Sequence, residues 1–313
     1  MTVSQYLREW LRAKQPELQR STFEAYTVYL EKQIIPYFDR LGKQLEELRP
    51  LDIRAYVTAK RTGGRLDGKP GGLSPVSVRK HLNVLKQAFR EAVLYEVLPA
   101  SPAAPVRLPK SGANLPPRFI SLEEARDVLA ALEGHPLYPL VLVTLYYGLR
   151  RSEAIGLRWS AVNFPRGTLT ISHTVVKNLT IEAKDGTKTA SGFRVFPLLP
   201  EIAGALGALY SPGVPPNGYI FARSDGSPLR PDSVTRGFQR ALRRAGLPGM
   251  RFHDLRHATA TILFDRGWSV PDVQHWLGHA DIETTMNIYV SYARTRPLEL
   301  GGALAGLFMK KET

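Results

Sequence analysis

Apolar residues recur at helical spacing through most of the first hundred residues. The clearest stripe belongs to the segment SPVSVRKHLNVLKQAFREAVLYEVL. Its apolar side chains stand three or four residues apart, at Val78, Leu82, Leu85, Phe89 and Val93. Ser74 is placed to cap this helix, and Pro75 occupies a first-turn position that tolerates proline. The pattern predicts a helical N-terminal domain over residues 1–98.

Capping boxes, in which Ser or Thr is followed three residues later by Glu, predict two more helix starts. Ser21 and Glu24 have this spacing ahead of an apolar run, and Ser121 and Glu124 have it early in the second half of the chain. We therefore expect one helix to begin near Ser21, and helices to continue from Ser121 to about residue 160.

Residues 99–117 separate the two halves with six prolines and no periodicity, which is typical of an extended linker. Beyond them, GTLTISHTVV and GFRVFPL alternate apolar and polar residues, with the polar stretch EAKDGTKTASG between them. This pattern predicts a small antiparallel sheet. We therefore expect a mainly α protein with a small antiparallel β-sheet in its second domain, an α+β arrangement.

The composition is that of an ordinary folded protein, with 43% hydrophobic and 22% charged residues. No apolar run approaches the roughly 20 residues of a membrane span, and the N-terminus lacks the apolar core of a signal peptide. The absence of cysteine excludes disulfides, thiolate catalysis and cysteine metal sites. We expect no membrane association, and a cytoplasmic location.

Charge points to a polyanionic partner. The chain carries 42 Lys and Arg against 28 Asp and Glu, a net charge of +14. Both halves are basic, with 19 basic and 11 acidic side chains in residues 1–110 and 23 and 17 in the remainder. Because no single tail explains the excess, nucleic acid is the leading partner, although a basic protein that merely stays soluble has the same composition.

Several short segments of the second domain carry polar residues that an ordinary core does not need. YYGLRRSEAIGLRW places Arg150 directly after a predicted helix end, with Glu153 three residues later. TKTASGFRVFPL places Lys188 in a turn that leads into a strand. Taken singly, the first is also typical of a surface ion pair, and the second of a solvated lysine.

The segment WLGHADIETTMNIY contains His279 and Tyr289. At helical spacing, Tyr289 falls in line with Ile282, Met286 and Ala293. Taken alone, this stripe favours a tyrosine packed in the core.

The segment HDLRH places His253, Arg256 and His257 on one face of a helix. Three interpretations are open: a solvated face, a zinc site and a phosphate site. For zinc the two histidines have ligand spacing, but Asp254 replaces the usual Glu, Arg256 adds a cation, and no cysteine is available. For phosphate, a guanidinium matches the oxygens in a bidentate fork, and an imidazole can move a proton.

Together, these segments resemble the tyrosine recombinase (phage integrase) family. GLRRSE, TKTASGFRVFPL, HDLRH and LGHADIETTMNIY follow the family's motifs in order and spacing over roughly residues 119–293. The helical N-terminal domain is more loosely similar to the family's SAM-like, core-site DNA-binding domain. The resemblance implies an enzyme that cleaves a DNA strand with a tyrosine and rejoins it to a new strand.

The resemblance also implies catalytic roles. Arg150 and Arg256 would clamp the scissile phosphate, Tyr289 would attack it, and His253 would be the base. The general acid would be Lys188.

A further histidine and a carboxylate complete the implied site. His279 would hydrogen-bond the phosphate, and Glu153 would orient Arg150 or His253. The product would be a 3′-phosphotyrosyl link with a free 5′-hydroxyl, so no cofactor and no metal are expected.

The family implies a domain division and an assembly. We expect a core-binding domain over residues 1–98, the linker over 99–117, a catalytic domain over 118–295 and a tail over 296–313 that either folds back or docks on a neighbouring protomer. The two domains would close as a clamp on duplex DNA at specific core sites. A monomer or dimer would assemble into a homo-tetramer on two sites, integrating or excising a mobile element.

The helix from Ser74 is the leading candidate for reading the DNA groove. The candidate DNA-binding residues are Ser77, Arg79, Lys80, Asn83 and Lys86, with Arg236 and Arg240 on a later helix. Two alternatives remain, a type IB topoisomerase-like enzyme and a DNA-binding regulator with a retired active site.

Overall fold

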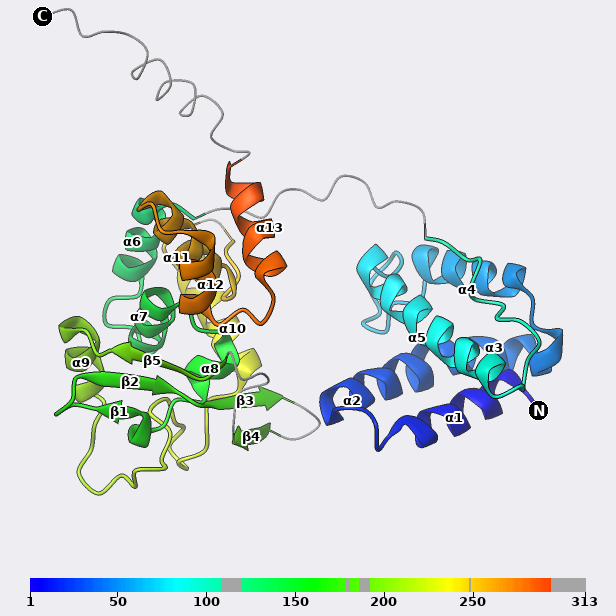
Figure 1. Cartoon of the computed structure of the whole chain (residues 1–313), viewed down its shortest axis with the longest axis horizontal. Helices are drawn as coiled ribbons and strands as arrows, with labels where there is room; N and C mark the ends of the chain where they lie inside the picture. Colours follow the sequence, from blue (N-terminus) through cyan, green and yellow to red (C-terminus); the bar gives the residue numbers. More distant parts are fainter. Residues whose placement is uncertain (109–119, 178–180, 186–191, 248, 294–313) are drawn as a thin grey trace, which may run out of the picture. The chain divides into compact units, whose positions relative to one another are not determined.

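The chain forms two compact units, Met1–Leu115 and Pro116–Thr313 (Figure 1). The structure, a computed structural model, describes residues 1–108, 120–177, 181–185, 192–247 and 249–293. Helices dominate both units, and the second adds short antiparallel strands, so the predicted fold class is confirmed. None of the described helices is both long and apolar enough to cross a membrane.

The N-terminal unit packs its helices around one apolar core. They are α1 (Val3–Lys14), α2 (Arg20–Tyr29), α3 (Ile35–Leu41), α4 (Pro50–Thr62) and α5 (Pro75–Leu94), with a π turn at Leu30–Ile34 and a 3-10 turn at Leu45–Glu47. The predicted stripe of α5 faces this core. Tyr6 of α1 donates a hydrogen bond to the Ala88 carbonyl at 2.7 Å. After α5, Ala103 and Val106 are buried in the same core, so residues 99–108 pack on this unit.

Two of the three predicted N-caps are confirmed. Ser74 accepts a hydrogen bond from the Ser77 amide at 3.1 Å and caps α5. Ser121 and Glu124 form a complete capping box. These helix starts are therefore set by local sequence.

A helix begins near Ser21 as predicted, but the predicted capping box of Ser21 and Glu24 is wrong. α2 begins one residue earlier, at Arg20, with Gln19 as its N-cap, so Ser21 lies inside the helix. The carboxylate of Glu24 pairs with Arg20 at 3.1 Å. This i, i+4 ion pair uses the carboxylate that the capping box requires.

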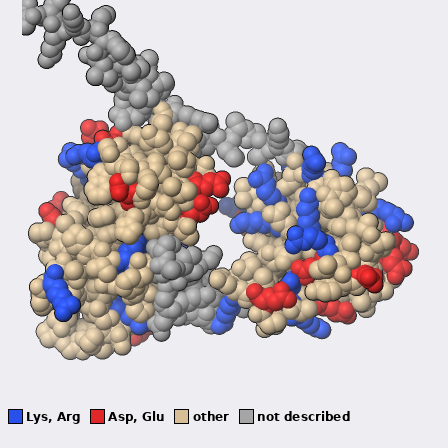
Figure 2. Space-filling view, viewed as in Figure 1, with Lys and Arg blue, Asp and Glu red and all other residues tan. Residues whose placement is uncertain are grey.

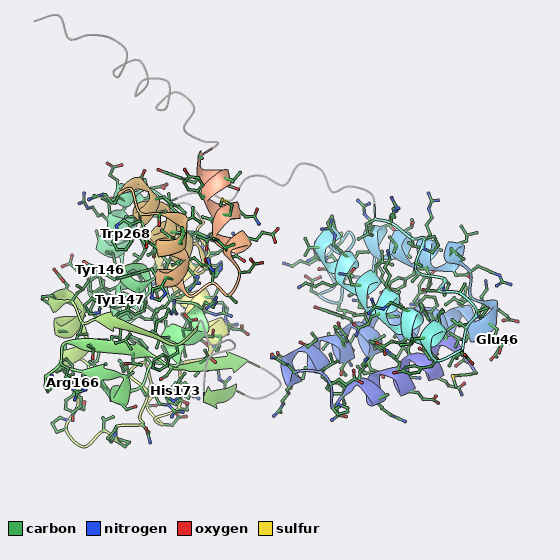
Figure 3. All side chains as sticks on the ribbon, in the orientation of Figure 1. Glu46, Tyr146, Tyr147, Arg166, His173 and Trp268 are labelled. Carbon is green, nitrogen blue, oxygen red and sulfur yellow. The ribbon has the colours of Figure 1, made fainter. Side chains whose placement is uncertain are left out.

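The second unit surrounds a buried central helix. Its helices are α6 (Leu122–Ala131), α7 (Tyr138–Tyr147), α8 (Arg151–Ile155), α9 (Pro200–Gly207), α10 (Pro231–Arg244), α11 (Asp254–Asp265), α12 (Val270–Leu277) and α13 (Ile282–Ala293), with a 3-10 turn at Trp159–Ala161. α7 is apolar on nearly every face and packs against α6, α9 and α11. At its end, Tyr147 stacks on Phe196 and donates to the Pro197 carbonyl at 2.8 Å, which joins α7 to the sheet (Figure 3).

The strands form two small antiparallel sheets. The first has the order β1 (Val162–Asn163), β2 (Thr168–Ile171) and β5 (Arg194–Pro197), and the second pairs β3 (His173–Lys177) with β4 (Ile181–Asp185). Pairing of β2 with β5 confirms the predicted contact between the two alternating segments. β4 lies in the polar stretch between them, where no strand was expected, because ladder hydrogen bonds join backbone groups whatever the side chains.

Gly156, at the end of α8, allows this helix to approach β3 closely. A Cβ atom there would lie 2.9 Å from the His173 carbonyl oxygen and 2.9 Å from the Thr174 Cα. Because both are backbone atoms, we expect Gly156→Ala to lower the free energy of unfolding by about 1–3 kcal/mol. Urea denaturation of the full chain measures this change.

Gly204→Ala provides the matched control, because Gly204 lies within α9 and a Cβ there would meet no atom within 4 Å. This variant is expected to be as stable as the wild type or more stable, by up to about 1 kcal/mol. Equal stability of Gly156→Ala and the wild type would contradict the close approach.

Candidate active site

Arg150 occupies the junction between α7 and α8. α7 ends at Gly148, whose φ of +60° is a left-handed conformation that favours glycine. Arg150 then caps α8, and Glu153 accepts hydrogen bonds from its backbone N–H at 2.9 Å and its guanidinium at 2.6 Å. The expected local ion pair exists, but its carboxylate is 1% exposed, so it is not a surface pair.

The Glu153 carboxylate is the centre of a buried cluster of arginines. Arg194 of β5 donates to its Oε2 atom at 2.6 Å, and Arg256 of α11 lies 3.8 Å from the same atom. Burial by itself would raise the pKa of Glu153, but the three neighbouring guanidinium groups outweigh it and hold the pKa below its ordinary value. Of the two predicted partners of Glu153, the described contacts include Arg150 and not His253.

Arg256 contributes the most deeply buried cation. Its side chain is 2% exposed, and its Nη1 donates to the Gly148 carbonyl at 2.7 Å. Burial, and then the charge of Arg150, lower the pKa of Arg256 to about 9. Within the described residues, its Nη2 has no hydrogen-bond partner. A buried donor is therefore available to a ligand.

His253 and His257 lie at the N-terminal end of α11. Their rings are 4.9 Å apart in a T-shaped arrangement, and His253 is exposed. Partial desolvation, followed by the charges of His257 and Arg256, lowers the pKa of His253 to about 4. Across the part of the chain that the structure describes, no three His, Cys, Asp or Glu side chains are grouped to hold a metal ion.

His279 follows the end of α12 and faces the same cluster. Gly278 ends the helix with a φ of +68°, and its carbonyl accepts from Arg150 at 3.0 Å. His279 is buried, and its Nδ1 is hydrogen-bonded to the Thr285 hydroxyl at 2.7 Å. Burial, and then the charges of Arg256 and Arg150, lower the pKa of His279 to about 3. The ring is therefore neutral at physiological pH.

Tyr289 lies on the exposed side of α13. The buried side chains of this helix are Thr285, Ile288 and Tyr292. The stripe of Ile282, Met286 and Tyr289 is exposed, so the interpretation as a packed tyrosine is wrong. The Tyr289 ring meets the Phe264 ring edge to face at 5.1 Å, leaving 41% of the residue exposed. Thr285, one turn earlier, links the helix of Tyr289 to His279.

Arg194 is the member of the cluster that sequence analysis missed. The burial of β5 alternates, with Arg194 and Phe196 inside and Val195 and Pro197 outside. An arginine on the inward face of an alternating strand requires a buried partner, and that was the available signal. Lys188, the predicted general acid, lies outside the described residues.

The predicted DNA-binding residues belong to other elements than this cluster, namely α5 of the N-terminal unit and α10 of the second unit. On α5, Arg79, Lys80 and Asn83 are exposed, whereas Ser77 and Lys86 are partly buried. Lys80 and Asn83 line a groove of about 290 Å³ shared with α2. Figure 2 shows lysine and arginine side chains on the upper part of the N-terminal unit, with acidic side chains along its lower and right-hand edges.

Two further candidates lie in the second unit. Arg236 and Arg240 are exposed, one turn apart on α10. Like the α5 residues, they are absent from the described contacts of the Glu153 cluster.

Known proteins match both units. Residues 118–296 match the phage integrase family, and residues 2–60 match the phage integrase N-terminal SAM-like domain. The chain is 31% identical to the tyrosine recombinase XerC of Methylobacterium sp. (strain 4-46), covering 90% of this chain and 88% of the relative. It is 25% identical to a tyrosine recombinase XerC-like protein of Caldanaerobacter subterraneus subsp. tengcongensis, covering 92% and 79%.

Solved structures show the same fold. The Tn1549 transposon integrase in complex with a circular intermediate DNA has a TM-score of 0.78 at 21% identity, covering 96% of this chain and 99% of that one. A lambda integrase tetramer bound to a Holliday junction has a TM-score of 0.66 at 21% identity, covering 90% and 78%. Since the family match spans more than half of its length, the chain belongs to the phage integrase family of tyrosine recombinases, enzymes that cleave and rejoin DNA strands.

Proposed function

We propose that the family's phosphodiester chemistry is performed in this chain by Arg150, Lys188, His253, Arg256, His279 and Tyr289. The observation that carries the proposal is the buried Nη2 of Arg256, which has no partner among the described residues. It belongs to a cluster in which three guanidinium groups share one carboxylate. An unsatisfied buried donor costs about 1–3 kcal/mol, and a bound anion would remove that cost.

A phosphodiester suits this surplus of positive charge. Arg256 and Arg150 would hold the non-bridging oxygens, on which charge increases during in-line attack. Each guanidinium is fixed before the reaction by a glycine carbonyl, Gly148 for Arg256 and Gly278 for Arg150. Preorganised donors of this kind typically contribute about 10²–10³ in rate each.

Tyr289 would be the nucleophile, and its exposure on α13 supports access to DNA. A phenol is mostly protonated near neutral pH, so the attack needs a base. His253 would take the proton. An imidazole is mostly unprotonated at neutral pH, which is the state that can accept a proton.

His279 would donate a hydrogen bond to the phosphate. Its Nδ1 is engaged by Thr285, which leaves Nε2 for the ligand. If Thr285 donates and Nδ1 accepts, the single proton of the neutral ring resides on Nε2. The tautomer that can donate to a phosphate oxygen is then selected by Thr285.

Lys188 would protonate the leaving 5′-oxygen, a role supported by the family resemblance. The Tyr289 oxygen forms a bond to phosphorus while the bond from phosphorus to the 5′-oxygen breaks. The products are a 3′-phosphotyrosyl ester and a free 5′-hydroxyl, and a second 5′-hydroxyl reverses the step. The ester conserves the bond energy, so the cycle needs no cofactor.

The substrate would be duplex DNA with specific core sites, bound in the cytoplasm. The exposed residues of α5 and the groove beside Lys80 support a role for α5 in reading the DNA.

The lambda integrase tetramer on a Holliday junction supports assembly of four copies on two sites. Integration or excision of a mobile element is the proposed outcome, and relaxation of plasmids without a core site would instead favour topoisomerase activity.

Tyr289→Phe is expected to abolish covalent attachment to DNA, because the variant lacks the attacking oxygen. The substrate is a nicked suicide duplex carrying the core site, which a footprint of the protein on DNA flanking its gene would first identify. The readout is a protein–DNA band that survives SDS. Tyr210→Phe, which changes an exposed tyrosine outside the cluster, should keep the band.

The same assay tests the alternatives. A persistent band with Tyr289→Phe would refute the assignment of the nucleophile. Wild-type cleavage is expected to continue in EDTA, and a loss that Zn²⁺ restores would favour the zinc interpretation of HDLRH. A wild type that binds the site without any band would be a regulator.

His279 is expected to remain neutral at pH 5.5 with its proton on Nε2, whereas a free imidazole of pKa about 6.5 would be mostly charged. Nitrogen NMR of histidine-labelled protein, assigned with His279→Gln, reports both properties. Because the unfolded chain binds this proton near pH 6.5 and the folded chain only near pH 3, stability falls as pH decreases below 6.5.

Thr285→Val should mix the two tautomers, and Thr285→Ser should retain the wild-type pattern. A fully charged His279 ring at pH 5.5, or an unchanged tautomer in Thr285→Val, would contradict the proposed role of Thr285.

Lys80→Gln should weaken DNA binding about equally across sequences and reduce the slope of log affinity against log salt by about 1. Fluorescence anisotropy at several salt concentrations measures both quantities. Arg166→Gln, on the exposed β1–β2 turn, is the control and should leave the slope unchanged (Figure 3). Equal slopes for Lys80→Gln and the wild type would exclude a phosphate contact.

A further inference from the structure

We propose that Arg194 is a positioning residue of the active site, holding the side chain of Arg150 and the backbone next to His279 in their reactive arrangement. The inference rests on the proposed function. The Arg194 side chain is 4% exposed, so it acts through other residues and not by touching DNA. Its guanidinium makes hydrogen bonds in two directions, one toward Glu153 and one toward the end of α12.

In the first direction, Arg194 fixes the carboxylate that orients Arg150. Its Nη2 donates to Glu153 Oε2 at 2.6 Å, while Arg150 donates to Oε1, also at 2.6 Å. The two guanidinium groups therefore hold opposite oxygens of one carboxylate. Without Arg194, Oε2 would keep the Arg150 backbone N–H, at 2.9 Å, and Arg256, at 3.8 Å, as its neighbours among the described groups. The Glu153 carboxylate would lose its only side-chain hydrogen bond to Oε2 within the described residues, and the Arg150 guanidinium would be held less firmly.

In the second direction, Arg194 binds the carbonyl end of α12. Its Nη1 donates to the carbonyls of Trp276, at 3.1 Å, and Leu277. The next carbonyl, of Gly278, accepts from Arg150. The last carbonyls of a helix lack helical partners and carry the negative end of the helix dipole, which makes guanidinium groups suitable partners. Two arginines thus fix three consecutive carbonyls immediately before His279.

Only arginine can make this connection. Its planar fork presents several donors in fixed directions, whereas the lysine ammonium is a single point on a flexible stem. The Arg194 guanidinium also lies 5.6 Å from the centroid of the Phe196 ring, which restricts its plane. The shape of the side chain is therefore as necessary as its charge.

The test compares Arg194→Lys and Arg194→Gln with the wild type at 15 °C. Single-turnover cleavage of the suicide duplex at saturating protein should slow about 10- to 100-fold, because small misplacements of catalytic groups have effects of this size. Affinity for the intact duplex should change by less than about twofold, since Arg194 does not face DNA. Arg223→Lys, a surface arginine paired with Asp225, is the matched control and should behave as the wild type.

A double-mutant cycle separates positioning from a general effect on the fold. If Arg194 acts through Glu153, adding Glu153→Gln to Arg194→Lys should slow cleavage little beyond the larger single effect. A rate loss in the double variant equal to the product of the two single rate losses would overturn the proposal. Wild-type cleavage by a folded Arg194→Lys would also overturn it, as would failure of both Arg194 variants to fold, which would assign the residue to stability alone.

These outcomes are distinct from failure of the proposed function. If the wild type forms no covalent complex, the proposed function fails and this inference fails with it. If the wild type cleaves and Arg194→Lys is unimpaired, only the inference fails.

Discussion

The architecture of the site depends on one buried carboxylate among guanidinium groups. Glu153 is almost fully buried, and an isolated charge there would be strongly unfavourable without partners. Its partners come from the start of α8, from β5 and from α11. Each element must therefore end or pass within reach of this side chain. The requirement to compensate Glu153 fixes where a strand and two helices meet.

The positive charge around Glu153 exceeds the single negative charge of its carboxylate, and this excess determines which ligands the site favours. Three guanidinium groups surround one carboxylate, and each also donates to backbone carbonyls that terminate a helix. Gly148 and Gly278 end α7 and α12 in left-handed conformations and present their carbonyls to Arg256 and Arg150. Helix termini thus orient the cations without neutralising them. The cluster keeps a net positive charge suited to a phosphate.

Tyr289, the proposed nucleophile, and the residues proposed to hold the phosphate occupy different environments. Arg256 and His279 are buried, whereas Tyr289 remains accessible on α13. The connection between them is the hydrogen bond between His279 and Thr285, one helical turn before Tyr289. This arrangement keeps the Arg256 guanidinium away from water, where its electrostatic effect is strongest. It also leaves the Tyr289 side chain accessible from solvent.

The sequence by itself determined the features that depend on local spacing. The caps at Ser74 and Ser121 and the buried stripe of α5 follow from residues close together in the chain, and the alternation within each of the segments of β2 and β5 identified it as a strand. The family motifs likewise identified the candidate catalytic residues, because the residue types, order and spacing of a motif can be read directly from the sequence. The roles of those residues, including Lys188, remain proposals.

Only the tertiary structure decided which side chains share the buried cluster. Arg194 contacts Glu153, 41 residues away, and the end of α12, more than 80 residues away. Helical spacing placed Tyr289 with Ile282 and Met286 but could not tell whether that stripe faces the core or the solvent. Periodicity records which residues share a face, whereas burial and charge pairing depend on what packs against that face.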